Sequence, residues 1–140
     1  MPTRSIHVTG DDMQRLRNIL SARARTSARD HAHLESLWDE LDRAIVVSAE
    51  EAPADVVTMR TRVRILDLGS GQQADYTLVY PWEADLASNR VSVLAPLGTA
   101  LLGYREGDQI EWRMPGGVRR LHVERILHQP EAKQREEHAA

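Results

Sequence analysis

The spacing of the apolar residues changes once along this chain, across the segment 48–55, and this change constrains the fold more than any other feature. Before the segment, apolar residues recur every three or four positions, as on one face of an amphipathic helix. After it, alternating apolar and polar runs are separated by turns containing Gly or Pro, which is typical of strands. Pro53 cannot continue a helix interior, so the helical part should end before it. The sequence therefore predicts an α+β fold.

The helical part predicts two helices that pack against each other. The apolar positions at helical spacing are Met13, Leu16, Ile19 and Leu20 in the first, and Leu34, Leu37, Trp38, Leu41 and Ile45 in the second. Each stripe is narrow and suits one partner, so we expect a short antiparallel hairpin with its tip near 26–30. Arg25, Arg29 and Asp30 lie at this tip, and Asp30 is expected to cap the second helix.

The rest of the chain predicts an antiparallel sheet with one short helix packed against it. The expected strands are 61–68, 75–80, 90–94, 108–114 and 118–127. The helix 96–102 begins at a proline and ends before Gly103, the usual position of a C-terminal cap. The expected division of the chain is a helical hairpin at 1–48, a linker at 49–57, a globular domain at 58–130 and a flexible tail at 131–140.

Composition and charge exclude several kinds of site. The 140 residues contain no cysteine, which excludes thiolate nucleophiles and zinc–thiolate sites, and no phenylalanine, which disfavours an aromatic-lined pocket. The formal net charge of −3 disfavours strong direct binding to nucleic acid, so a protein partner or a small molecule is expected. No apolar run approaches the ~20 residues that span a bilayer, and no signal peptide is recognisable, so the expected location is cytoplasmic.

No catalytic group, metal site or cofactor is predicted. The glycine-containing segments 69–71 and 115–117 do not precede a helix, so they are expected to be hairpin turns rather than phosphate-binding loops. His31 and His33 are two positions apart and point to different sides of a helix, which prevents them from sharing a metal ion. His122 has no second ligand nearby in the sequence. No serine lies in a nucleophile elbow.

The second half of the chain resembles the C-terminal domain of the Gre-factor superfamily. The segment 90–107 contains a strand ending in Ala-Pro-Leu, a helix of small residues, Leu-Leu-Gly and a final Gly followed by Asp108, in the order typical of GreA and GreB. The segments 40–44, 55–59, 78–81 and 129–132 are similar to the Rnk type of this superfamily, the regulators of nucleoside diphosphate kinase. Many separate motifs in one order make this resemblance specific.

The resemblance implies an FKBP-like domain behind a short coiled-coil hairpin. It also implies a non-enzymatic transcription regulator that binds RNA polymerase at the rim of the secondary channel. Docking is assigned to the loop Ala95, Pro96, Leu97 and Gly98, in which Leu97 either faces a partner or joins Leu101 and Leu102 in the core. Cleavage factors of the superfamily have a longer hairpin with an acidic pair at its tip. Two alternatives stay open, namely an active transcript-cleavage factor and a stand-alone prolyl isomerase.

Overall fold

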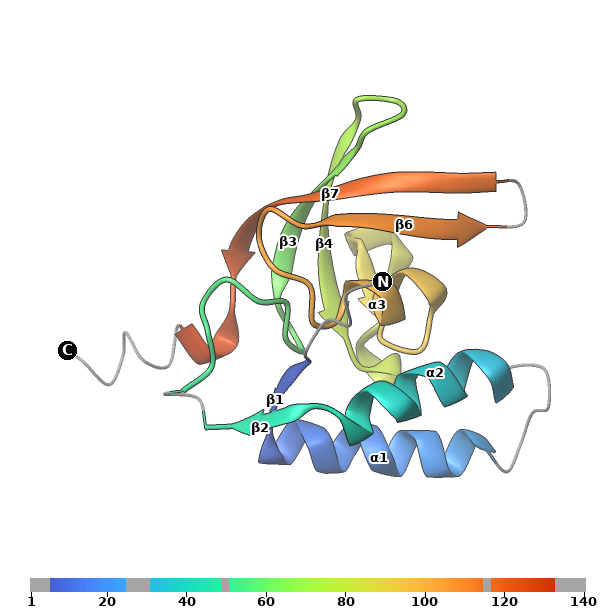
Figure 1. Ribbon diagram of the computed structural model, residues 1–140, viewed down its shortest axis with the longest axis vertical. Helices are drawn as coiled ribbons and strands as arrows, with labels where there is room; N and C mark the ends of the chain where they lie inside the picture. Colours follow the sequence, from blue (N-terminus) through green and yellow to red (C-terminus); the bar gives the residue numbers. More distant parts are fainter. Residues whose placement is uncertain (1–5, 25–30, 49–50, 115–116, 133–140) are drawn as a thin grey trace.

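The computed structural model describes residues 6–24, 31–48, 51–114 and 117–132 of the chain (Figure 1). Its N-terminal part consists of β1 (His7–Thr9), α1 (Gly10–Ala24), α2 (His31–Asp42) and β2 (Ile45–Val47). The two long helices lie side by side below the sheet in Figure 1. Thr9 is the N-cap of α1, because its side chain accepts a hydrogen bond from the Asp12 backbone N–H at 3.3 Å.

The second helix ends earlier than its apolar stripe predicts. Ile45 was expected to be the last residue of that stripe, but α2 ends at Asp42 and Ile45 begins β2. β2 pairs in parallel with β1, and the backbone N–H of Ile45 donates to the carbonyl of Ile6 at 2.8 Å. The run Ile-Val-Val is β-branched, and such residues fit a strand better than a helix. The expectation that Ile45 continues the helix was wrong, because β1 offers a strand with which this segment pairs.

The C-terminal part is a sheet of five strands in the order β5-β4-β3-β7-β6. The strands are β3 (Arg62–Asp67), β4 (Gln73–Val79), β5 (Arg90–Ser92), β6 (Gln109–Met114) and β7 (Gly117–His128). The sheet was expected to be antiparallel throughout, but β4 and β5 pair in parallel. Their connection, which contains the 3-10 turns η1 (Pro81–Glu83) and η2 (Leu86–Ser88), is long enough to return the chain in the same direction.

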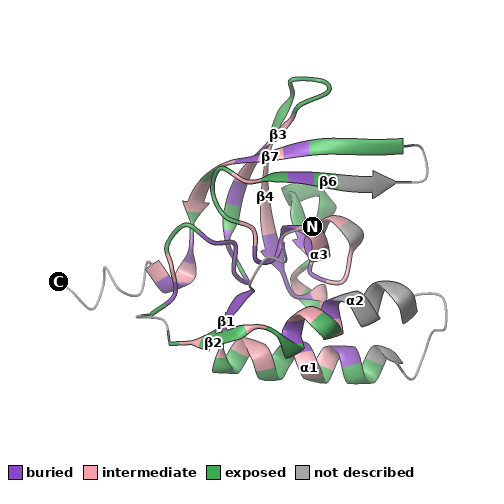
Figure 2. Ribbon diagram, in the orientation of Figure 1, coloured by how far each residue is buried: buried purple, intermediate pink, exposed green. Residues whose placement is uncertain are grey.

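One hydrophobic core joins the helices to the sheet. Leu16 and Leu20 of α1 and Leu37 and Leu41 of α2 belong to the same buried cluster as the inner face of the sheet. Leu101 and the following Leu102, at the end of α3 (Pro96–Leu101), are fully buried, as expected. Figure 2 shows the buried residues where these layers meet. Within the described residues, no helix is long and apolar enough to cross a membrane.

The flexible tail was expected to begin at residue 131, but residues 131 and 132 are still part of the folded structure. A helical turn covers 130–132, and Glu131 is only 4% exposed. The hydroxyl of Thr58 donates to the Glu131 carboxylate at 2.8 Å, while the Gln129 side-chain amide donates to the carbonyls of Pro53 and Val56. Buried polar groups need hydrogen-bond partners, and these long-range bonds supply them. They thereby hold the end of β7 against the segment that follows β2.

Candidate functional site

The segment that we call the loop 95–98 consists of Ala95, which precedes α3, and the first turn of α3 itself, and it is held rigidly against the end of β5. Ala95 is extended, with φ −73° and ψ 151°, and α3 begins at the following proline. The backbone N–H of Ala95 donates to the carbonyl of Ser92 at 3.0 Å. From the first turn of α3, the Thr99 hydroxyl donates to the carbonyl of Val93 at 2.6 Å. A proline at the start of a helix and these backbone contacts leave the loop little conformational freedom.

Gly98 allows α3 to approach β5 very closely. A Cβ atom at this position would lie 1.9 Å from the carbonyl oxygen of Ser92 and 2.8 Å from its carbonyl carbon. Both are backbone atoms, which cannot move aside as a flexible side chain can. Sequence reasoning assigned Gly98 to docking alone, whereas its geometry shows that it also positions the helix.

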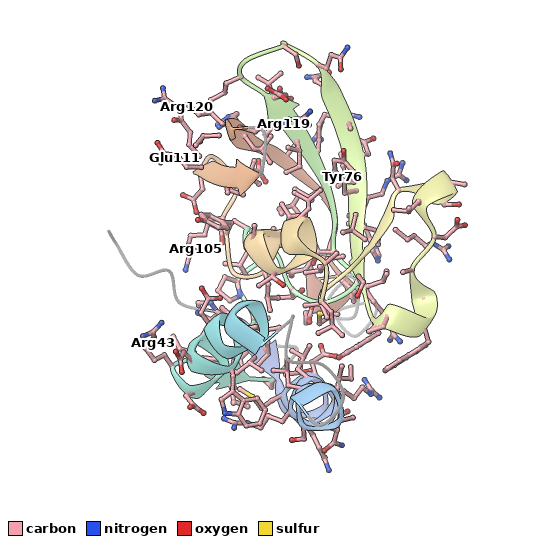
Figure 3. All side chains as sticks on the ribbon, turned by 90° about the vertical axis from the view of Figure 1, so that its right-hand side faces the viewer. Arg43, Tyr76, Arg105, Glu111, Arg119 and Arg120 are labelled. Carbon is pink, nitrogen blue, oxygen red and sulfur yellow. The ribbon has the colours of Figure 1, made fainter. Side chains whose placement is uncertain are left out.

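Leu97 is half-buried and packs against the core, so it combines the two orientations considered from the sequence. It also lines a cavity of about 120 Å³ between α3 and the sheet. Ile65 and Leu121 supply part of the apolar wall of this cavity. Tyr76 of β4 and Arg119 of β7, which also line it, lie above α3 in Figure 3. The loop therefore borders a small hollow whose wall is partly apolar and which is also lined by the cationic Arg119 and the acidic Asp67.

The residues expected at the hairpin tip cannot be placed relative to this loop. Arg25, Arg29 and Asp30 all lie outside the described residues, so the proposed capping role of Asp30 remains a prediction. In the described part of the chain, no group of three His, Asp or Glu side chains is arranged to hold a metal ion.

A second cluster, which the sequence did not reveal, connects α1 to the sheet. The Tyr80 ring is fully buried, and its hydroxyl donates to the Asp12 carboxylate in the first turn of α1. Trp82 stacks on the same ring with the centroids 4.9 Å apart. The Arg60 guanidinium lies 5.5 Å from the ring centroid and donates to Glu83 at 3.1 Å. This cluster sets the position of α1 relative to the strand that leads to η1.

Burial and the hydrogen bond to Asp12 strongly raise the pKa of Tyr80 above its ordinary value. In the unfolded chain a tyrosine ionises near pH ~10. Because the folded pKa is the higher one, the stability contributed by neutral Tyr80 is fully present below this pH and is lost as the pH rises above it. The sequence gives only a weak signal for this role of Tyr80, namely that it is one of three tyrosines and is followed by Pro-Trp-Glu.

We expect Tyr80→Phe to lower the free energy of unfolding by about 1 to 2 kcal/mol at pH 7, because Asp12 loses a hydrogen-bond donor. Above pH ~10, the free energy of unfolding should fall less steeply with pH in the variant than in the wild type, because the variant lacks the hydroxyl that ionises. Urea unfolding between pH 7 and 11 measures both effects, with Tyr76→Phe as a control expected to keep the wild-type slope. Equal slopes for Tyr80→Phe and the wild type would contradict this account.

Comparisons with known proteins agree on one family. Residues 52–128 match the family model of the C-terminal part of the transcription elongation factors GreA and GreB, and residues 4–47 match the model of the Rnk N-terminus. Over 99 residues the chain is 48% identical to the regulator of nucleoside diphosphate kinase of Escherichia coli K12, which covers 70% of this chain and 73% of that protein.

Two further relatives extend this likeness to elongation factors. The chain is 38% identical over 97 residues to the transcription elongation factor GreA of Rhodospirillum rubrum, covering 69% of this chain and 61% of that protein. A solved structure of a prokaryotic GreA/GreB elongation factor from Nitrosomonas europaea matches with a TM-score of 0.75 and 38% identity. That match covers 90% of this chain and 100% of the other.

Proposed function

The chain belongs to the Gre-factor superfamily and is of the Rnk type, and on this premise we propose that it is a non-enzymatic transcription regulator that binds RNA polymerase through the loop 95–98. The observation that carries the proposal is the position of Leu97, half-buried on a rigid loop at the border of a cavity. A preorganised apolar side chain costs little conformational entropy to bury on a partner.

The contacts around the loop support a docking role. The bond from Ala95 to Ser92 and the bond from Thr99 to Val93 hold the loop in one conformation before any partner arrives. Arg119 beside the cavity could pair with a carboxylate of the partner next to an apolar contact. An apolar anchor in a pocket with a charged rim is the arrangement in which few residues supply most of the binding energy.

The finer description of the fold is part of the same proposal. We assign α1 and α2 to a short coiled-coil hairpin and the remaining sheet with α3 to an FKBP-like domain. The side-by-side position of the two helices and the packing of α3 on β4, β5 and β6 support this assignment (Figure 1). The relatives named as transcription elongation factors support RNA polymerase as the partner, and we place the contact at the rim of its secondary channel.

The direct test is retention of purified core RNA polymerase by the immobilised full-length chain. We expect retention, and we expect a Gre-type cleavage factor added in excess to displace the polymerase, because both proteins would occupy the same rim. Failure to retain polymerase would overturn the proposal. Retention without competition would overturn the assigned location at the secondary channel.

We also expect that this protein does not stimulate transcript cleavage. α1 contains 15 residues, which corresponds to an arm of about 22 Å at 1.5 Å per residue. The tip segment carries one acid, Asp30, near Arg25 and Arg29, whereas two carboxylates normally fix Mg²⁺ well. Stalled elongation complexes incubated with the protein should therefore keep their transcripts intact.

The variant Asp30→Asn separates this expectation from the alternative of an active cleavage factor. Asparagine is as good an N-cap as aspartate, so the variant should bind polymerase within a few-fold of the wild type. Robust cleavage by the wild type that disappears in Asp30→Asn would establish the cleavage factor instead. An assay with a proline-containing peptide tests the other alternative, a prolyl isomerase, and we expect no acceleration.

A further inference from the structure

The face of the five-stranded sheet opposite α3 carries arginines rather than apolar residues. Val63 and Ile65 of β3 are buried in the core, so their neighbours Arg62 and Arg64 point to the other face, because successive side chains of a strand alternate. The Arg62 side chain is 58% exposed and the Arg64 side chain 38%. This face is thus accessible and is separate from the loop 95–98.

The strand register gathers further basic side chains beside these two. Thr77 of β4 pairs with Arg90 of β5 on one side and with Arg62 of β3 on the other. Arg62 in turn pairs with His128 of β7. Arg64 pairs with Arg125 of β7 in the adjoining row. Neighbouring strands are about 4.8 Å apart, so the first row spans roughly 14 Å across the sheet. We call Arg62, Arg64, Arg90 and Arg125 the arginine face.

The carboxylates on this face are already engaged. Asp75 accepts from Arg64 at 2.9 Å and lies 3.7 Å from Arg62. The hydrogen bond from Arg64 holds the pKa of Asp75 below its usual value. Glu124, beside the bulge of β7, accepts two hydrogen bonds from the Gln73 amide at 2.8 and 2.9 Å. The acids therefore order this face without neutralising it.

A third carboxylate, Asp85, pairs with Arg90 across an antiparallel bridge and accepts a hydrogen bond from the Ala87 backbone N–H. Four guanidinium groups therefore face three carboxylates, which leaves an excess of one positive charge in a chain of net charge −3. Among the described residues, Arg90 and Arg125 form no ion pair, and both are exposed. Arginine carries a planar fork of donors that matches a carboxylate in a bidentate manner. The unpaired guanidinium groups are consequently the strongest unused recognition groups on this side of the sheet.

We propose that the arginine face binds an acidic polypeptide segment of a partner protein, whose Asp and Glu side chains pair with Arg90 and Arg125. The charge complementarity favours a short acidic segment over a nucleic acid. A protein that binds a phosphate backbone well makes roughly six to ten cationic contacts, whereas this face offers only two arginines that are not already paired. The long-range field of a net negative chain also opposes a long polyanion, whereas a short segment meets only the local charge.

Titration of the ¹⁵N-labelled full-length protein with a peptide of ten glutamates, followed by NMR, tests this proposal. We expect chemical-shift changes concentrated in β3, β5 and the second half of β7, which weaken strongly when NaCl is raised from 50 to 300 mM. A DNA duplex of twelve base pairs is titrated in parallel. Tighter binding of the duplex at the same salt would overturn the acidic-protein assignment, as would peptide-induced shifts located elsewhere or none at all.

Substitutions provide a matched comparison of single charges. Arg125→Gln should weaken peptide binding about threefold and the double variant Arg90→Gln with Arg125→Gln about tenfold, as expected for exposed ion pairs. Arg43→Gln removes an exposed arginine that follows α2 and lies beside the helices, below the sheet, in Figure 3, and it should leave the affinity unchanged. An equal loss in Arg43→Gln and Arg125→Gln would show that only net charge matters and would contradict a defined site. Retention of polymerase, which tests the loop 95–98, is measured in a separate assay, so that either proposal can fail without the other.

Discussion

Replacing Leu97 with aspartate should weaken binding to core RNA polymerase by at least about thirty-fold. The substitution places a charge where the proposed contact excludes water, and loss of an interface anchor costs about 2 kcal/mol or more. Leu97 lies in the first turn of α3, which is already ordered by hydrogen bonds from Ala95 and Thr99 to Ser92 and Val93, so the effect should arise from the contact itself rather than from disorder. Affinity for purified core polymerase, measured by fluorescence anisotropy, gives the ratio directly.

Thermal melting of the same variant distinguishes docking from core packing. Leu97 is only half-buried, so its aspartate should reach solvent and the variant should still unfold cooperatively. Leu86→Asp is a suitable control, because Leu86 is 86% exposed and lies in η2 outside the proposed contact. A cooperative melt with unchanged affinity would exclude docking through Leu97. A collapsed melt would show that Leu97 belongs to the core, because an unpaired buried charge is costly.

Gly98→Ala should lower the free energy of unfolding by about 3 kcal/mol or more. The added methyl group would meet the Ser92 carbonyl oxygen at 1.9 Å, and only a shift of α3 away from β5 can relieve this overlap. We expect the melting temperature to fall by roughly 10 °C. Because α3 carries the docking loop, polymerase affinity should fall as well.

Gly10→Ala is the matched control for this prediction. A Cβ atom at Gly10 would meet nothing within 4 Å, so the same chemical change should leave stability nearly unaltered. Urea unfolding of the two variants and the wild type gives the comparison. A Gly98→Ala protein as stable as the Gly10→Ala protein would mean that α3 and β5 can separate at little cost, and the role assigned to the close approach would be wrong.

Much of the local structure followed from the sequence because its signals are local. The apolar spacing of Leu16 and Leu20 indicates a helix, alternation around Val63 and Ile65 indicates a strand, and a proline followed by a small-residue run and Gly103 delimits α3. Each of these signals lies within a few residues of the structure that it specifies. The α+β class and the membership of the Gre-factor superfamily rest on such segments.

The tertiary structure alone decided how distant segments complete one another. Ile45 leaves the helical pattern because β1 offers a parallel partner, and the parallel pairing of β5 depends on the path of its long connection. Tyr80 meets Asp12 across 68 positions of sequence. The need for glycine at position 98 arises from the Ser92 carbonyl on the opposite side of a turn. In each case the deciding atom lies on another element, and a one-dimensional pattern does not specify distances between elements.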